Sequence, residues 1–322
     1  MLLPRPSRGQ RQLRVPWRRF VVWGYRLHEH THSYIHEAFH RAARWLGLDA
    51  VWLPDEPIDP GALAGSLVLT EGQVDRCLPV RDDCFYVVHN WDPSRPSYEL
   101  VRRRGNYLAL QVLIDDVVAS EAKPVNGFAC AYLDERERVL YTPWATDLLP
   151  DEIDRQRKRL PRLLGRRDGV AWVGTIGAGA FGNAEEVTPF VREAQLLGLT
   201  FTHRVAISRR EHVRTIERAL LAPAIVGAWQ LGKGYIPCRI FKNASYGHIG
   251  VTNSRAVRDL FGDELCLWNV DTAALCREAY AWNTTLPARS RTATIGELMG
   301  EVAAKHTFVA RLKLLLDVIG NL

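Results

Sequence analysis

The sequence predicts an α/β protein with two successive domains, each built on a mostly parallel sheet. The chain has 322 residues, more than one ordinary hydrophobic core needs and suited to two domains of roughly 150 residues each. Short apolar runs alternate with segments of helical periodicity, as strand-helix-strand units do. The alternation starts again after a charged, Arg-rich stretch at residues 150–164, which indicates a second α/β domain.

The first half begins with an apolar strand and an amphipathic helix. Residues 20–23 form the apolar run, and residues 33–46 follow with Ile35 and Phe39 on one helical face. Gly47 is a typical helix terminator. This order favours parallel pairing, and further strands are expected at residues 49–53, 66–70, 84–89, 107–114, 127–133 and 139–141.

The second half repeats the pattern with clearer helix signals. Ser208 and Glu211 form a capping-box sequence at the start of one helix, and Pro237 and Gly247 bracket another. Helices are expected at residues 184–197, 208–220, 237–246, 272–282, 295–304 and 308–319. Strands are expected at residues 170–173, 199–207, 222–226, 249–252 and 265–270.

These elements predict five parts of the chain. Residues 1–19 form a basic, flexible tail, and residues 20–150 form the N-terminal α/β domain. Residues 151–168 form a linker helix, and residues 169–304 form the C-terminal domain. Residues 305–322 form a last helix that packs back on the N-terminal domain. The two domains are expected to face each other across a cleft that binds a ligand.

Composition and charge exclude several protein classes. The chain is 47% hydrophobic, and no run of about 18 apolar residues is present to span a membrane. The net charge of +6 comes from six arginines within residues 1–19, so a basic nucleic-acid-binding body is not expected. These arginines also leave no room for a secretory h-region. The six cysteines lack a CxxC pair, which is typical of reduced thiols in a cytosolic protein.

A glycine-rich turn at residues 174–182 follows a predicted strand and precedes a predicted helix. Its glycines let backbone amides approach a pyrophosphate, and the helix N-terminus adds a partial positive charge. The spacing of Gly177, Gly179 and Gly182 also fits GxGxxG, so an NAD(P)-dependent oxidoreductase is an alternative. Against it, the next predicted strand ends without an Asp or Glu to hold a ribose, and the motif lies in mid-chain. A tight turn with a purely packing role is a further alternative.

A second block, residues 234–254, carries two cations near the start of a helix. Arg239 and Lys242 are three positions apart and therefore share a helix face. Two cations at a helix N-terminus suit a diphosphate. A solvated pair of surface cations is the alternative interpretation.

Residues 172–254 resemble the donor-binding domain of GT-B glycosyltransferases. In that family a glycine-rich loop opens the second domain, and a later helix, followed by a Gly and a short apolar strand, faces the donor's diphosphate and sugar. The sequence at residues 23–36, Trp-Gly-Tyr-Arg-Leu-His-Glu-His-Thr-His-Ser-Tyr-Ile-His, is similar to bacterial and large-virus glycosyltransferase-like proteins. The resemblance implies a GT-B-like fold, with two Rossmann-like domains facing across a cleft.

The resemblance also implies a nucleotide-sugar co-substrate, a UDP, GDP or dTDP sugar, and no tightly bound cofactor. Retaining members carry a second glutamate where this chain has Lys242, and the Glu-x7-Glu pattern is absent, so the stereochemical outcome stays open. Cations of the protein at the diphosphate would make a metal unnecessary. The expected donor-binding residues are Gly174, Thr175, Gly177, Gly179, Arg239, Lys242, Asn243, Ser245 and Asn253.

Five histidines gather within residues 28–40, at and after the end of the first predicted strand. Open α/β sheets place ligands at that end of a strand, and a neutral His can accept a proton from an acceptor hydroxyl. His30 or His32 is the predicted base, Glu29 is its predicted orienting partner, and His28 is assigned to the acceptor side.

A zinc site on the same helix is an alternative use of these histidines. His32, His36 and His40 are four positions apart and would share a helix face. The group lacks a Cys and an acidic partner, so no metal is expected. A structural role is preferred for His36 and His40.

Two further polar groups follow predicted strands. His89 and Asp92 are expected to line the acceptor side, with a turn or cap role as the alternative for Asn90 and Asp92. Arg209 and Arg210 stand at a helix start and could touch phosphate, but they are interpreted as a solvated pair.

Together with these patterns, the resemblance implies a cytoplasmic glycosyltransferase that moves a sugar from a nucleotide-sugar donor to a hydroxyl of a glycan, lipid-linked or other acceptor. The basic tail could add weak contact with nucleic acid or with an anionic membrane, which would make the protein membrane-peripheral. The alternatives are an NAD(P)-dependent oxidoreductase that uses the loop at residues 177–182, and a non-catalytic ligand- or nucleic-acid-binding protein that uses the tail. No pattern specifies the donor base, the sugar, the acceptor or the oligomeric state.

Overall fold

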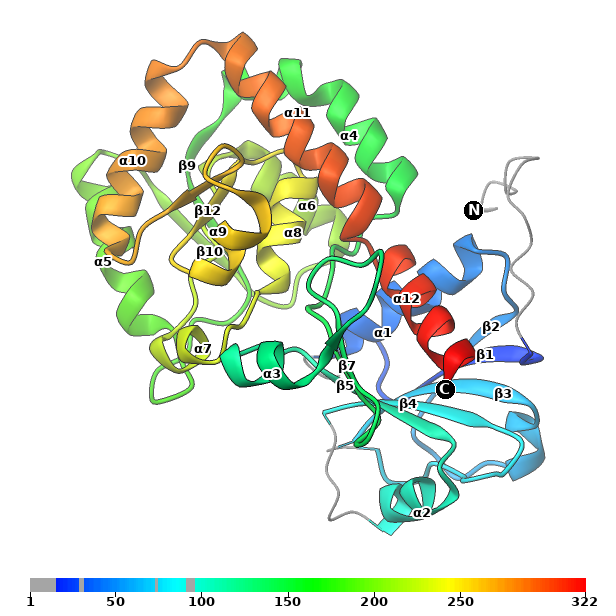
Figure 1. Ribbon diagram of the computed structural model, residues 1–322. Helices are drawn as coiled ribbons and strands as arrows, with labels where there is room; N and C mark the ends of the chain where they lie inside the picture. The colour runs from blue at the N-terminus through cyan, green and yellow to red at the C-terminus, as the bar shows by residue number, and fades with distance from the viewer. Residues whose placement is uncertain (1–15, 29–31, 73–74, 91–95) are drawn as a thin grey trace. The chain divides into compact units, whose positions relative to one another are not determined.

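The computed structural model describes residues 16–28, 32–72, 75–90 and 96–322 (Figure 1). The chain falls into two compact units. Unit 1 contains the described residues up to Gln111, together with Glu121–Thr142 and Phe308–Leu322. Unit 2 contains Val112–Ser120 and Pro143–Thr307. Each unit has its own strands and its own buried residues.

Unit 1 is built on an eight-stranded sheet of spatial order β2-β1-β3-β4-β5-β8-β7-β6. Pairing is parallel from β2 to β8, whereas β7 and β6 are antiparallel. The expectation of a mostly parallel sheet is confirmed. The strands are β1 (Arg19–Trp23), β2 (Ala50–Leu53), β3 (Ser66–Glu71), β4 (Phe85–His89), β5 (Tyr107–Gln111), β6 (Lys123–Pro124), β7 (Tyr132–Asp134) and β8 (Val139–Tyr141).

Helices cover the central strands of unit 1. Every residue of β3 is buried, as in parallel sheets that are covered on both faces. Helix α1 (Ser33–Trp45) packs on β1, and α12 (Phe308–Asn321) packs on α1. Between the two helices, the rings of Phe39 and Phe308 meet edge to face at a centroid distance of 4.8 Å, a favourable aromatic geometry. The other helices of the unit are η1 (Pro60–Leu63) and α2 (Pro96–Arg104).

The register of β3 and β4 brings the last residues of the two strands side by side. Leu67 is paired with Phe85, and four positions later Glu71 is paired with His89. Both residues therefore stand at the carboxyl edge of the sheet. Open α/β sheets bind their ligands at this edge.

Unit 2 contains a three-stranded parallel sheet and a two-stranded parallel pair. In the first, β9 (Asp168–Val173) lies between β10 (Phe201–Arg204) and β11 (Ala219–Leu221). The pair consists of β12 (Gly250–Thr252) and β13 (Cys266–Trp268). The Ala224 amide donates to the Val251 carbonyl at 2.8 Å, so the chain that leaves β11 runs beside β12.

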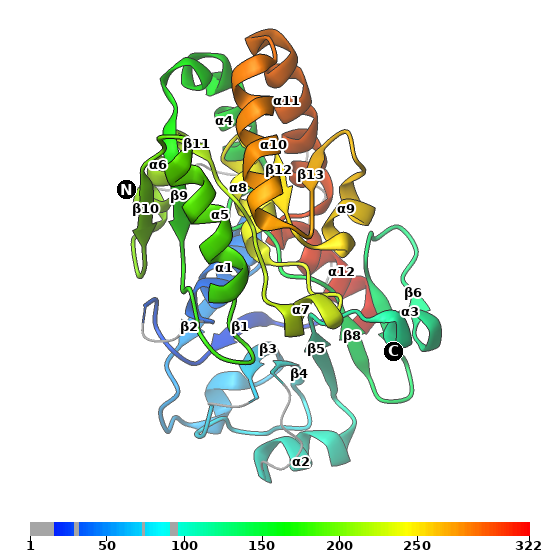
Figure 2. The same ribbon diagram turned by 90° about the vertical axis from the view of Figure 1, so that its left-hand side faces the viewer.

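Helices of unit 2 pack in pairs. Helix α4 (Pro150–Leu163) lies along α11 (Ala288–Lys305), and α5 (Ala184–Leu196) lies along α10 (Thr272–Thr285), as Figures 1 and 2 show. Among the described residues, no helix is both long enough and apolar enough to cross a membrane. The other helices are α3 (Asp116–Glu121, whose last residue belongs to unit 1), η2 (Leu164–Arg166), α6 (Arg209–Arg218), α7 (Ala228–Gly232), α8 (Cys238–Ser245) and α9 (Arg255–Phe261).

One local signal is confirmed in atomic detail, and two strand predictions are wrong. The Ser208 hydroxyl accepts from the Glu211 amide at 3.3 Å, and the Ser208 amide donates to the Glu211 carboxylate at 3.0 Å. The capping box therefore starts α6. The strand expected at residues 222–226 forms earlier, because Ala219 and Leu221 pair with β9. That pairing is a long-range contact, which local periodicity does not report. The strand expected at residues 127–133 begins only at Tyr132, as β7, because the chain before it forms turns.

The domain organisation differs in detail from the predicted one. The chain enters unit 2 at Pro143, and α4, which was expected to be a linker, packs on α11 inside that unit. Helix α12 is grouped with unit 1. The predicted tail, residues 1–19, lies outside the described residues except for its last four.

Candidate functional site

The glycine-rich loop of unit 2 starts at Gly174, a position whose backbone conformation favours glycine. Gly174 follows β9 with a φ of +117°, a conformation that L side chains rarely adopt. Its carbonyl accepts a hydrogen bond from Trp172 Nε1 at 3.1 Å and from the His203 ring at 2.8 Å. The start of the loop is therefore held by β9 and β10.

The end of the loop closes on itself at the N-terminus of α5. The Gly177 carbonyl accepts from the amides of Asn183 and Ala184, both at 2.9 Å. The Gly177 amide donates to Asn183 Oδ1 at 3.1 Å. A Cβ at Gly182 would lie 2.1 Å from the Gly177 carbonyl oxygen, so this close approach requires glycine. The closed loop presents a rigid rim at the start of α5.

A pocket lies beside this rim, and we call it the glycine-loop pocket. Its volume is about 260 Å³, near the lower end for ligand pockets. Phe181 at its wall is 71% exposed and meets Trp229 edge to face at 5.0 Å. The pocket is lined by Thr175, Gly177, Phe181, Gly182, Asn183, Ile225, Val226, Gln230, Tyr235, Pro237, Cys238 and Arg239.

Arg239 is the cation of the glycine-loop pocket, and two contacts hold it. Its guanidinium stacks on the Trp172 ring at 3.8 Å, and its Nε donates to the Val173 carbonyl at 3.3 Å. A Cβ at Gly174 would lie 2.8 Å from its Nη2, so the glycine makes room for it. Burial lowers the pKa of Arg239, yet a guanidinium keeps its charge in proteins. The site therefore holds a fixed, partly desolvated positive charge.

Lys242 belongs to a second group, the Asp147 cluster, formed by Asp147, Arg209, His212, Lys242 and Tyr246. The Tyr246 hydroxyl donates to Asp147 Oδ1 at 2.5 Å, and both side chains are buried. Burial alone would raise the pKa of Asp147, but Lys242 and the other polar neighbours lower it below its usual value. The carboxylate is therefore ionised and holds the cations around it.

His212 and Arg209 direct hydrogen-bonding atoms into the same cluster. Burial, reinforced by Lys242, lowers the pKa of His212 to about 3, so this ring is neutral at neutral pH. Arg239 also lowers the pKa of His212, which places the pocket cation close to the cluster. Among the residues that the structure describes, His212 Nε2 and Arg209 Nη1 are buried without a hydrogen-bond partner. Buried polar atoms of this kind are rare in folded proteins, and a water, an ion or a polar ligand can satisfy them.

The structure thus divides the predicted donor-binding residues into two groups. Thr175, Gly177 and Arg239 line the pocket, and Lys242 lies in the Asp147 cluster. Arg209 departs from the predicted solvated pair, because its side chain reaches the cluster while Arg210 is exposed.

The other predicted residues of this block have internal partners. Asn243 donates to the Ala222 carbonyl at 2.8 Å, and Ser245 donates to the Lys242 carbonyl at 2.8 Å. Asn253 binds both the amide and the carbonyl of Val226, at 3.0 and 2.9 Å. All three side chains are buried, and Asn243 and Asn253 tie α8 and the end of β12 to the chain that follows β11. Their role toward a ligand remains a prediction.

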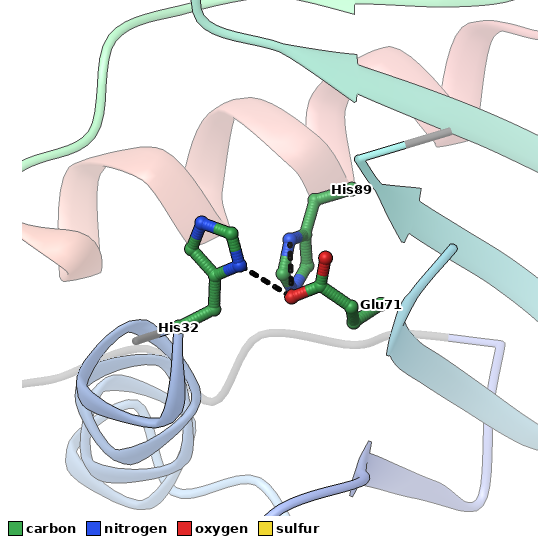
Figure 3. A group of neighbouring side chains, drawn as sticks. All are labelled: His32, Glu71 and His89. Atoms are coloured by element: carbon green, nitrogen blue, oxygen red, sulfur yellow. Dashed lines mark hydrogen bonds and ion pairs between the residues drawn. The ribbon is translucent and has the colours of Figure 1, made fainter. Parts of the chain in front are cut away.

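A second candidate site lies at the carboxyl edge of the sheet in unit 1 (Figure 3). His32, directly before α1, places its Nδ1 2.5 Å from Glu71 Oε2. Asn90 donates to the other oxygen, Oε1, at 2.6 Å, and Asn90 adopts a φ of +49°. His89 Nδ1 lies 3.7 Å from Glu71 Oε2. We call His32, Glu71 and His89 the His-Glu-His group.

The exposure of this group differs between the carboxylate and the His32 ring. The Glu71 side chain is 1% exposed, whereas the His32 side chain is 25% exposed. A buried carboxylate that accepts from Nδ1 leaves Nε2 of the same imidazole as the basic nitrogen. Sequence analysis missed Glu71, although its position at the end of an apolar strand was the signal that singled out His89.

Of the remaining residues predicted for the acceptor side and the base, the structure describes His28 and His89. His28 is exposed, and its Nδ1 lies 2.9 Å from the Tyr34 hydroxyl. His89 is fully buried. Glu29, His30 and Asp92 lie outside the described residues.

The structure does not support the alternative of a zinc site on one face of the helix that follows His32. His36 Nε2 lies 2.8 Å from His89 Nε2, and His40 Nε2 lies 3.3 Å from the Ala50 carbonyl. The histidines of α1 therefore point to different partners, and both His36 and His40 have contacts within unit 1.

Comparison with known proteins gives a match in structure but not in sequence. No family model matches the chain, and no curated protein sequence matches it. The structure is similar to "alpha-glucosyltransferase (AGT) in complex with UDP", with a TM-score of 0.61 and 9% identity over 94% of this chain and 99% of that chain. It is also similar to an alpha-glucosyltransferase in complex with UDP-glucose and DNA containing an abasic site (TM-score 0.58, 10% identity, 93% and 98% covered).

A third similar structure is that of trehalose-6-phosphate synthase, OtsA. Its TM-score is 0.54, with 9% identity over 94% of this chain and 99% of that chain. At such identities the likeness establishes the fold. The chain has a GT-B-type fold with two Rossmann-like domains, as its sequence predicted.

Proposed function

We propose that the protein is a glycosyltransferase that binds a nucleotide-sugar donor in unit 2 and passes the sugar to a hydroxyl acceptor. The observation that carries the proposal is the gathering of Arg209 and Lys242 around one carboxylate, Asp147, with Arg239 close to the His212 ring of the same cluster. Three cations against one anion leave a positive site beside the glycine-loop pocket. Such a site suits a diphosphate, which forms charge-assisted hydrogen bonds with guanidinium and ammonium groups.

The same charges explain how the site would promote transfer. Negative charge grows on the diphosphate as the bond to the sugar breaks, so fixed cations stabilise the transition state more than the bound donor. Arg239 is suited to this role because Trp172 and Val173 already hold its guanidinium. The proposal assigns charge neutralisation to these side chains, without a metal at the diphosphate.

The pocket wall supports binding of the nucleoside part of the donor. Phe181 and Trp229 offer exposed aromatic surface, and Gln230 brings an amide to the same pocket. Aromatic surface and a few polar groups are what planar ligands use. The proposal leaves the base open among UDP, GDP and dTDP donors.

We further propose that His32 is the base that accepts the proton of the acceptor hydroxyl. Its support is the hydrogen bond with Glu71, which holds the ring and stabilises the imidazolium that forms. Glu71 thus takes the orienting role that sequence analysis gave to Glu29. The acceptor remains a glycan, lipid-linked or other hydroxyl compound.

The oxidoreductase alternative receives less support. Strand β10 ends at His203 and Arg204, so no carboxylate stands at its end to bind a ribose. Gly182 serves the closure of the loop on Gly177. The glycine spacing is therefore accounted for by the turn itself.

Thermal stabilisation by a ligand panel tests the proposal. The panel contains UDP, GDP, dTDP, ADP, their sugar conjugates and NAD(P)H. A ligand at 100 times its Kd stabilises the folded state by about 2.7 kcal/mol. We expect stabilisation by one nucleoside diphosphate and its sugar conjugate, followed by transfer from that donor.

The control compares Arg239→Ala with Arg210→Ala, which removes an exposed cation of the same kind. We expect the first variant to lose the stabilisation and the second to keep it. A shift with NAD(P)H alone, or equal shifts in both variants, would overturn the proposal.

A further inference from the structure

The His-Glu-His group brings three ligand-forming atoms together at one point of unit 1. One ligand atom from each of His32, Glu71 and His89 lies within 4.8 Å of the other two. Figure 3 shows both rings turned toward the same carboxylate oxygen. Two imidazoles and one carboxylate are a common ligand set for zinc and other divalent transition metals.

The separations of these atoms fit a metal after a small adjustment. A tetrahedral ion bonded at about 2.0–2.1 Å keeps its ligand atoms about 3.3 Å apart. Glu71 Oε2 lies 2.5 Å from His32 Nδ1 and 3.7 Å from His89 Nδ1, values on either side of this spacing. A small rotation of the His32 ring away from Glu71 would open the site.

The surrounding contacts resemble those that hold metal ligands in place. His36 Nε2 lies 2.8 Å from His89 Nε2, so a bond between the two fixes the ring while Nδ1 faces Glu71. Asn90 binds Glu71 Oε1 and leaves Oε2 to the histidines. Partners of this kind orient ligands and tune their affinity. Asn90 Nδ2 also lies 3.0 Å from His32 Nδ1, so this amide has to turn aside when a metal enters.

The partly exposed side chain of His32 gives a metal ion access to the group and leaves one coordination position open to water. Glu71 and His89 are buried, while a quarter of the His32 side chain is exposed. The ion would enter on the His32 side and have three protein ligands. A fourth position is then left for water, as in zinc sites with three protein ligands.

We propose that His32, Glu71 and His89 bind one divalent transition-metal ion, with Zn²⁺ the best fit, and that the bound ion inhibits the enzyme. The metal takes Nδ1 of His32 and Oε2 of Glu71, the two atoms whose hydrogen bond activates the base. The ring remains neutral because its proton moves from Nδ1 to Nε2 through solvent, so Nε2 can no longer accept a proton from a hydroxyl. The inhibition rests on the proposed function, whereas the binding of the metal does not.

Cobalt binding tests the site without any enzyme assay. The full chain, freed of metal by chelation, is titrated with Co²⁺, whose visible absorption reports tetrahedral coordination, and Zn²⁺ is added to compete. We expect one ion per chain. We expect His89→Ala and His32→Ala each to weaken binding by about tenfold or more, and His40→Ala, on the same helix, to leave it unchanged.

Because His89 is buried, its replacement by alanine can prevent folding, and the His32→Ala variant then decides the test. A folded His32→Ala protein that binds Co²⁺ as the unaltered chain does would overturn the proposal. Absence of a tetrahedral spectrum in the unaltered chain would overturn it as well.

The effect on catalysis is measured separately, as transfer from the donor found in the ligand panel. We expect equimolar Zn²⁺ to reduce transfer about tenfold or more, chelator to restore it, and donor-induced thermal stabilisation to stay the same. Unchanged or faster transfer with Zn²⁺ bound would refute the inhibition. If no donor is found, the proposed function fails while the Co²⁺ result still decides the metal site.

Discussion

The guanidinium of Arg239 lies 3.8 Å from the centre of the Trp172 ring. The tryptophan stands at the penultimate position of β9, and the arginine lies in the first turn of α8. A stacked, hydrogen-bonded guanidinium loses little freedom when it binds an anion. The strand therefore orients a cation that is supplied by a helix 67 positions away in the chain.

Replacement of Arg239 by Lys separates charge from orientation. The lysine keeps a positive charge but cannot stack on Trp172 or donate to Val173 with a planar group. We expect a loss of about 2–4 kcal/mol in transition-state stabilisation, by analogy with the removal of one oriented donor. Steady-state kcat/KM with the identified donor measures it, with Arg210→Lys as the control. An unchanged kcat/KM would show that the stacked geometry is unimportant.

Replacement of Gly174 by Ala tests the room that the loop leaves for Arg239. The new Cβ would lie 2.8 Å from Nη2, and the φ of +117° is strained for alanine. We expect a stability loss of about 1–3 kcal/mol together with loss of donor binding. Gly198→Ala is the matched control, because Gly198 also has a positive φ but nothing within 4 Å of its Cβ position.

Urea unfolding and donor-induced thermal shifts distinguish the two variants. Both should be less stable, but only Gly174→Ala should lose the donor. Equal donor binding in the two proteins would argue against the role of Gly174 in seating Arg239.

Replacement of Asp147 by Asn removes the one carboxylate of its cluster. Lys242 and Arg209 would then repel each other in a partly buried place without compensation. We expect a stability loss of about 3–5 kcal/mol, as is typical when one partner of a buried charge pair is lost. Urea unfolding measures it, and Asp154→Asn in an exposed ion pair should cost less than about 1 kcal/mol. A similar small loss in both would contradict the proposed cluster.

His248 predicts a pH dependence of stability. Burial lowers the pKa of His248 well below 6.5. As the pH falls, the imidazole therefore takes up a proton at a higher pH in the unfolded chain than in the folded chain. The contribution of the neutral His248 ring to the free energy of unfolding is therefore fully present above about pH 6.5. It is lost as the pH falls toward the pKa of the folded state, by up to about 1.4 kcal/mol per pH unit.

The variant His248→Gln should make this slope shallower, whatever its effect on stability at neutral pH. Urea unfolding at a series of pH values between 7 and 5 measures the slope. The same slope in the variant would show that His248 is not responsible.

Replacement of His32 by Gln tests the proposed base. We expect kcat to fall by about 100- to 10,000-fold, the contribution of a general base, while the donor stabilises the protein as before. Glu71→Gln should reduce kcat less, because it removes the orienting carboxylate and not the base. His40→Gln is the control. Equal rates for His32→Gln and the control would remove His32 from the mechanism.

Much of the fold could be predicted because its signals are local. The apolar face of α1, the capping box of Ser208 and the glycines around residues 174–182 each involve residues within a few positions of one another. The α/β order followed from these signals, and so did the approximate position of Arg239 and Lys242. Strand β11 was misplaced because its position depends on pairing with β9, across about 50 residues.

The site residues that sequence analysis missed share one property, which is distance along the chain. Tyr246 meets Asp147 across 99 positions, and His32 meets Glu71 across 39. No periodicity links such residues, and each by itself is an ordinary polar residue at the end of an apolar segment. Their chemical meaning arises only from their neighbours.

The sequence by itself determined the class of fold and the kinds of group available: glycines where a loop must turn, cations within a helix, and histidines after a strand. It placed both cations near the start of that helix, whereas Lys242 lies in the last turn of α8. Only the tertiary structure decided which of these groups meet. The register of β3 and β4 sets Glu71 beside His89, and the packing of α8 sets Arg239 on Trp172. Local signals act through backbone geometry over a few residues, whereas a site depends on contacts that form when distant segments pack.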